Sequence, residues 1–285
     1  IHNDLAFKEV CKGGYWDLAY ILIKSEISEN TYKCGYTDAC KYNNFNLAIK
    51  LIDMGKIDIY TNHNFVFNQA CKYGNLEFFN KFIELGICKN YYKDGFIIAC
   101  SNGHLIIVNK FIELGIKPHV DNEDGIKFAC DHGHKNVVSR LLDFRTNIYG
   151  EYIFKWACKL DYIDIIDKLY DQGVDIHTNN EKAFKIACKN GNIDVMDKLF
   201  KFGANIHADD DYGLRIALQN NKENIADKLI SFYFDDHKCG SFNIPDEILK
   251  YNNRKRKIFD NIKKYDEHTK NDTDERERIQ WMLGQ

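Results

Sequence analysis

Hydrophobic and polar residues alternate along this chain in a pattern that returns about every 30 residues. The stretch 183–208 shows one period. Apolar residues within 184–188 form one face of a short helix, and a turn at 190–192 follows. Apolar residues within 193–200 then recur at spacings of three and four, which predicts a second, amphipathic helix that ends at Gly203. The repeating element is therefore predicted to be a two-helix unit.

Each unit carries a pair of small or apolar residues in its first helix, and the second of them is nearly always cysteine. The second positions of successive pairs are 28 to 31 residues apart. The pairs are Val10-Cys11, Ala39-Cys40, Ala70-Cys71, Ala99-Cys100, Ala129-Cys130, Ala157-Cys158, Ala187-Cys188 and Ala217-Leu218. A period of this length indicates stacked units, because each unit buries its apolar face only against its neighbours. We predict about eight units over residues 1–234.

The unit resembles the ankyrin repeat, which reads Leu-His-x-Ala-Ala, a Gly-His turn, Ile-Val, Leu-Leu and then Gly-Ala-Asp-Val-Asn. The Gly-His turn is kept at Gly103-His104 and Gly133-His134, and Gly191 and Gly203 fall on the two family glycines. The resemblance implies an all-α ankyrin-repeat solenoid of stacked helix pairs. It also implies a non-enzymatic scaffold that binds a protein partner on the concave surface of the array.

Two departures from the family pattern sharpen this expectation. The connections between units have 13–16 residues, against 18 in a 33-residue family unit, so we expect short turns in place of the projecting hairpins. The use of Ala-Cys where the family has Ala-Ala, with many Phe, Lys and Asn, is similar to the ankyrin-repeat families of giant amoeba-infecting DNA viruses of the mimivirus type.

The composition narrows the classes of partner that the chain can bind. The net charge is −3 over 285 residues, so the chain as a whole has no field that selects a nucleic acid or an anionic membrane. The longest stretch without charged residues, 95–109, is too short to span a bilayer. We expect a monomer with a protein partner, and neither nucleic-acid nor membrane binding.

The cysteines indicate the compartment. Seven of the ten occupy one repeated position. Packed helices lie about 8–10 Å apart, whereas a disulfide needs Cα atoms within about 7 Å. We expect these cysteines, among them Cys71, Cys100 and Cys158, to be buried and reduced in an intracellular compartment. The cytoplasm, including that of an infected host cell, is the first expectation, and the nucleus is also open.

The residue after each repeated pair is the candidate binding position, because in ankyrin proteins it faces the concave groove. Five of the eight residues at this position are lysines: Lys12, Lys41, Lys72, Lys159 and Lys189. Tyr42 and Tyr73 follow two of them and are predicted to point outward. This set is the predicted partner-binding site. The alternatives are a solvated lysine face and a track for a polyanion, which Ser101 and Asp131 interrupt.

Residues 235–285 do not follow the repeat and are predicted to form a C-terminal helical segment, helical to about Tyr265, with a charged tail. Residues 244–249 are similar to the opening of an F-box, which would make the chain a substrate adaptor for a ubiquitin ligase. The apolar end, 279–283, either docks on the body of the protein or binds a partner as a short peptide. A basic run could be a nuclear import signal, an anion contact or a solvated helix face; it comprises Arg254, Lys255, Arg256 and Lys257.

The sequence contains no catalytic constellation that we can identify. It has no glycine-rich phosphate loop, Gly-x-Ser-x-Gly or His-Glu-x-x-His. His104 and His134 stand in the Gly-His turns of successive repeats, and His177 and His207 occupy another repeated position. Positions on successive repeats are too far apart in space for one small metal ion, whose ligands must converge within a few ångströms. We therefore expect structural histidines, no enzymatic activity, no metal site and no cofactor.

Overall fold

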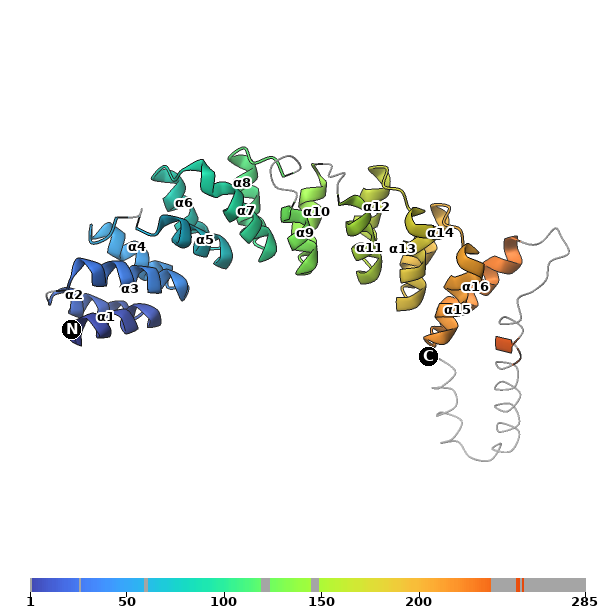
Figure 1. Cartoon of the computed structure of the whole chain (residues 1–285), viewed down its shortest axis with the longest axis horizontal. Coiled ribbons are helices and arrows are strands. Elements are labelled where there is room, and N and C mark those ends of the chain that lie inside the picture. Colours follow the sequence, from blue (N-terminus) through green and yellow to red (C-terminus); the bar gives the residue numbers. More distant parts are fainter. Residues whose placement is uncertain are drawn as a thin grey trace, which may run out of the picture. The chain divides into compact units, whose positions relative to one another are not determined.

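The computed structural model describes residues 2–25, 27–58, 61–118, 124–144, 149–236, 250–251 and 253. Eight helix pairs occupy the described residues, in chain order, and none of those residues is in a strand (Figure 1). The helices are α1 (His2–Gly13), α2 (Trp16–Ile23), α3 (Glu29–Lys41), α4 (Phe45–Asp53), α5 (His63–Tyr73), α6 (Leu76–Glu84), η1 (Lys89–Tyr91), α7 (Tyr92–Ser101), α8 (Leu105–Glu113), α9 (Asp124–Asp131), α10 (Lys135–Leu142), α11 (Gly150–Leu160), α12 (Ile163–Asp171), α13 (Thr178–Asn190), α14 (Ile193–Lys201), α15 (Ala208–Gln219) and α16 (Glu223–Asp236). This confirms the predicted all-α fold of paired helices.

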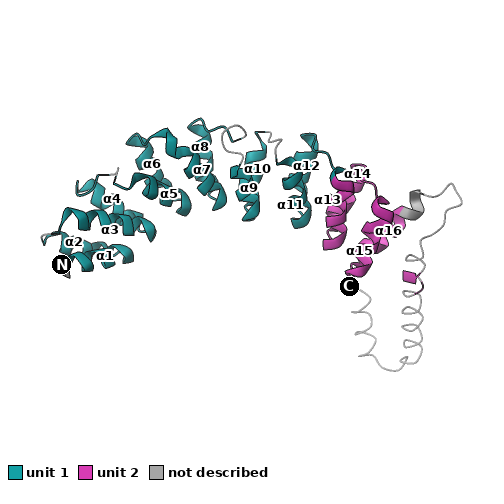
Figure 2. Ribbon diagram, viewed as in Figure 1, with its two compact units in different colours: residues 1–178 teal, residues 179–285 magenta. Residues whose placement is uncertain are grey.

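The chain divides into two compact units, residues 1–178 and 179–285 (Figure 2). Unit 1 holds repeats one to six, α1 to α12. Its first helices contact one another in sequence from α1 to α11, and α6, α8, α10 and α12 do the same among the second helices. In unit 2, α15 packs on α16. Of the predicted segment 235–285, only residues 235–236, 250–251 and 253 are described, so its boundary stays a prediction.

The repeated cysteines lie in the core. All seven are at most 1% exposed, which confirms the predicted burial of Cys71, Cys100 and Cys158. Desolvation raises the pKa of the thiols of Cys11, Cys130, Cys158 and Cys188 to about 12. Burial strips a thiolate of its hydration, so the neutral thiol is the form that packs.

Side chains just before the second helices of repeats two, four and five fasten these repeats to the preceding ones. His134 donates from Nε2 to the carbonyl of Ser101 at 2.9 Å, and His104 donates in the same way to the carbonyl of Lys72 at 2.7 Å. Asn44 donates from Nδ2 to the carbonyl of Lys12 at 2.6 Å. These bonds satisfy carbonyls at the C-terminal ends of first helices, and they confirm the structural role predicted for the two histidines.

The glycine of the turn makes room for this contact. Gly103 has φ +76°, and a Cβ added to it would lie 2.4 Å from Nδ1 of His134. Gly74, at φ +68°, stands in the same relation to His104. Glycine is required at these two turns for a left-handed backbone and for the close approach of the imidazole.

Candidate functional site

One side of each first helix is left uncovered by the packing, and we call it the first-helix face. It consists of the residues six and two positions before the repeated cysteine and one and two positions after it. Spacings of three and four place these positions on one side of a helix, while the cysteine and the residue before it lie on the buried side. The predicted lysine column forms one row of this face.

The structure places the predicted lysines in the last turn of their helices. Lys41, Lys72 and Lys159 are exposed in unit 1, and Lys189 is exposed in unit 2. Lys12 is half-buried, and its ammonium lies 2.6 Å from the carboxylate of Glu9. A cation in the last turn is favourable for the helix dipole, so part of this column has a structural reason.

The two predicted tyrosines differ. Tyr42 is 50% exposed, with the ammonium of Lys41 5.6 Å from its ring centroid. Tyr73 is half-buried; its hydroxyl donates to the carbonyl of Lys41 at 2.8 Å, and its ring centroid lies 6.1 Å from that of Phe45. The prediction that both point outward is therefore wrong for Tyr73, which joins repeats two and three.

Repeats five and six carry a group of apolar side chains on the first-helix face that the sequence analysis missed. We call it the aromatic patch: Phe128, Tyr152, Trp156 and Leu160. Phe128 and Tyr152 are each 39% exposed and Leu160 is 40% exposed. Trp156 is half-buried, with its ring centroid 5.1 Å from that of Tyr162. The patch spans two helices in contact, α9 and α11.

Tyr152 is held in place within the patch. Its hydroxyl donates to the carboxylate of Asp131 on the neighbouring helix. This hydrogen bond to a carboxylate, followed by desolvation, raises the pKa of Tyr152 to about 12, so the phenol stays protonated. The hydrogen bond fixes the ring, which leaves less side-chain freedom to lose when a partner binds.

A signal for the patch was present in the sequence. Tyr152, Trp156 and Leu160 are four residues apart on α11, a spacing that marks one side of a helix. The same helix carries a second apolar stripe that includes Ala157 and Cys158, and this second stripe is the buried one. A short helix with two apolar stripes can turn only one of them to the core, so the other must face solvent or a partner.

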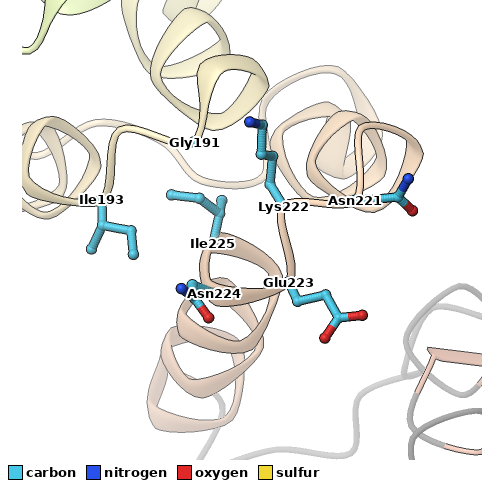
Figure 3. Close-up of a pocket in the computed structure, with 7 residues that line it drawn as sticks. All are labelled: Gly191, Ile193, Asn221, Lys222, Glu223, Asn224 and Ile225. Atoms are coloured by element: carbon cyan, nitrogen blue, oxygen red, sulfur yellow. The ribbon is translucent and has the colours of Figure 1, made fainter. Parts of the chain in front are cut away.

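Two shallow depressions lie at equivalent places in the repeats. One in unit 1 is lined by Gly103 and residues 133–137, and one in unit 2 by Gly191, Ile193 and residues 221–225. In Figure 3, Ile193 and Ile225 lie together, Lys222 runs beside Gly191, and Glu223 points away from them. Each depression follows from the contact between a turn and the next second helix.

The structure also bears on metals and membranes. No three His, Cys, Asp or Glu side chains among the described residues are grouped so that they could hold a metal ion. None of the helices in the described part of the chain combines the length and the apolar character that crossing a membrane requires.

Three predicted C-terminal features lie outside the described residues. They are the basic run Arg254, Lys255, Arg256 and Lys257, the F-box-like stretch 244–249 and the apolar end 279–283. Their roles stay predictions.

Comparison with known families identifies the repeat. Residues 96–180 match the family model for ankyrin repeats, in three copies. This stretch contains ankyrin repeats. The match covers repeats four to six and includes the whole aromatic patch. Ankyrin repeats indicate a protein–protein interaction scaffold, and the family is typically non-enzymatic. The sequence matches no curated protein.

Proposed function

We propose that this chain is a non-enzymatic scaffold that binds a protein partner through the first-helix face of unit 1. The observation that carries the proposal is the aromatic patch, in which three large apolar side chains are about two-fifths exposed around a half-buried tryptophan. Tryptophan and tyrosine are the side chains that most often dominate binding free energy when a partner buries them.

Lysines on the same face complement the patch. Lys159 lies on α11 beside the patch, and Lys41 and Lys72 lie on the first helices of repeats two and three. Exposed charges at the rim of an interface attract an oppositely charged partner and speed its encounter, while the apolar centre supplies most of the affinity. We therefore expect a partner with apolar anchor residues flanked by acidic ones, and Tyr42 as a secondary contact.

The test is capture of the partner from host-cell lysate, followed by titration against wild type and variants. Phe128→Ala and Leu160→Ala should each weaken binding about tenfold. Ile106→Ala is the matched control, because Ile106 is 64% exposed but lies on a second helix, α8, away from the first-helix face. An equal loss of affinity in the control would refute the proposal. Unchanged affinity in both patch variants, with circular dichroism showing that they are folded, would also refute it.

Salt and truncation separate the two alternatives. A protein interface with an apolar centre should lose little affinity between about 50 and 200 mM salt, whereas a polyanion bound by several lysines should lose about a thousandfold. An adaptor function should need residues 235–285, so a ligase component captured by the full chain should be lost when they are deleted.

We propose an intracellular, reducing compartment. Support comes from the nine described cysteines, none of which forms a disulfide. The resemblance to giant-virus families adds the proposal that this compartment is the host-cell cytoplasm, with the nucleus as the alternative. Localisation of the tagged chain, compared with a variant in which residues 254–257 are alanine, tests both.

A further inference from the structure

The last residues of the first helices in unit 1 form one row across repeats two to six, and we call it the end row. First helices of successive repeats contact one another in order, from α3 through α5, α7 and α9 to α11. The row therefore crosses these helices with one residue in each repeat and lies within the first-helix face. Its members are the residues that follow the repeated pairs: Lys41, Lys72, Ser101, Asp131 and Lys159.

Hydrogen bonds from the following repeats hold the row together. Tyr73 bonds the carbonyl of Lys41 at 2.8 Å, and His104 bonds the carbonyl of Lys72 at 2.7 Å. Side chains of the chain itself thus already use these main-chain carbonyls. What the row offers to a partner is mainly the chemistry of its own side chains.

The row carries charges of both signs in a fixed order. From repeat two to repeat six the order is cation, cation, neutral, anion, cation. The anion, Asp131, is exposed, and its carboxylate accepts a hydrogen bond from the hydroxyl of Tyr152, so it stands beside the aromatic patch. A basic row interrupted by an anion repels a uniform polyanion at that point, and it favours a partner whose own charge changes sign there.

The spacing of the row fits an extended partner. Packed helices lie about 10 Å apart and an extended chain advances about 3.3 Å per residue, so about three partner residues span one repeat. About 13 extended residues then cross repeats two to six. A helix advances about 1.5 Å per residue and would need about 27 residues, at a larger cost in conformational entropy if it folds on binding.

We propose that the end row binds an extended partner segment whose charges follow the complementary order. This inference rests on the proposed function and specifies the sequence of the partner. At about three residues per repeat, the segment has acidic residues at positions 1, 4 and 13, opposite the lysines, and a basic residue at position 10, opposite Asp131. Its apolar anchors stand at positions 11 and 12, where it passes from repeat five to repeat six over the aromatic patch.

The test is titration of the full chain with two synthetic 13-residue peptides of one composition. The matched peptide has glutamate at positions 1, 4 and 13, lysine at 10, leucine at 11, tryptophan at 12 and serine elsewhere. The swapped peptide exchanges the residues at positions 4 and 10. Each is made in both chain directions, and the tighter direction of each is compared by fluorescence anisotropy at about 50 mM salt. The matched peptide should bind about tenfold tighter, because the swap replaces attractive pairs at Lys72 and Asp131 by repulsive ones.

Two conservative variants locate the effect in the row. Asp131→Asn keeps an oxygen that can accept from Tyr152 but removes the charge, so the preference for the matched peptide should fall to about threefold. Glu84→Gln is the matched control. Glu84 is an exposed acid at the end of a second helix, α6, and lies off the first-helix face, so the preference should stay at about tenfold.

Equal affinity of the wild-type chain for the two peptides, or binding of neither, would overturn the charge order. A preference that Asp131→Asn leaves unchanged would overturn it as well. Tighter binding of a peptide whose charges are spaced by about seven residues would assign the row to a helical partner and overturn the extended register. The proposed function fails separately: a charge preference that persists while Phe128→Ala leaves the affinity for the matched peptide and for the captured partner unchanged would refute the role of the aromatic patch and support the charge order.

Discussion

Two columns of basic residues pass through the repeats of unit 1, and they make different contacts. The column at the end of the first helices is mostly exposed, as at Lys41 and Lys72. The column in the second helices, ten positions after the repeated cysteine, contains residues that join neighbouring repeats, such as Lys81 and Lys168. Lys168 donates to the carbonyl and hydroxyl of Ser139 and to Asp143, at 2.9–3.0 Å.

The difference lies in what the packing brings near each cation. Second helices of successive repeats lie side by side, so a long side chain on one reaches an acid on the previous one. Lys81 reaches Asp53, and in unit 2 Lys228 reaches Asp197 at 2.9 Å. The end of a first helix has no such acid within reach at Lys41 or Lys72 among the described side chains, whose ammoniums lie over their own neighbouring tyrosines. Lysines at the same period thus join neighbouring repeats in one column, while in the other column they stay exposed and available for binding.

The largest effect we expect is on the cysteines, which test whether position within the repeat decides exposure. Cys88 is exposed and lies outside the repeated position, while Cys130 and Cys158 are buried with pKa raised to about 12. Alkylation at pH 8 without denaturant should be at least about a hundredfold faster at Cys88, because the thiolate is the reactive form. Mass spectrometry of the labelled peptides measures this, and equal rates would break the link between repeat position and burial.

The next largest effect is on the free energy of unfolding that the contacts between repeats contribute. Lys168→Met removes the contacts to Ser139 and Asp143 and should lower the free energy of unfolding by about 1 kcal/mol, discounted for partial exposure. Lys110→Met is the control from the same column, because its ammonium bonds Glu113 of its own helix at 2.6 Å; it should cost about 0.3 kcal/mol. Urea denaturation compares the two, and equal losses would contradict a role for the column between repeats.

Acid should weaken the same contact. The hydrogen bond from Lys168, with that from Arg140, holds the pKa of Asp143 below its usual value in the folded chain. A depressed folded pKa contributes stability that is fully present above the unfolded value, about 3.9, and is lost as pH falls through the folded value. The destabilisation caused by Asp143→Asn should therefore be full at about pH 6 and fade below about pH 4. A constant difference across this range would show that the carboxylate charge is not involved.

The smallest effect should come from the exposed column. Lys41→Ala and Lys72→Ala should each change the free energy of unfolding by less than about 0.5 kcal/mol, because their ammoniums join no repeats. Tyr73→Phe, nearby on the same face, should cost about 1 kcal/mol through the lost bond to the carbonyl of Lys41. If the lysine variants destabilise as strongly as Tyr73→Phe, the two columns do not differ in the way described above.

Tyr42 and Tyr73 show what could not be predicted from the sequence, which is the direction in which a side chain points. Both follow a lysine at the same position, and the periodicity correctly places both near the end of a first helix. Tyr73 nevertheless turns to the neighbouring repeat, where the carbonyl of Lys41 and the ring of Phe45 are within reach. That choice depends on distances between residues about 30 positions apart, which spacing along one helix does not contain.

The sequence by itself determined the period, the paired helices, the burial of the cysteines and the Gly-His turn. These follow from local physics, since apolar spacing, turn glycines and small core residues act within a unit of about 30 residues. Only the tertiary structure decided which of two apolar stripes on α11 faces outward and which lysines join repeats. Those outcomes depend on what the stacking of units brings together, because an exposed side chain and a paired one have the same sequence signature until their neighbours are in place.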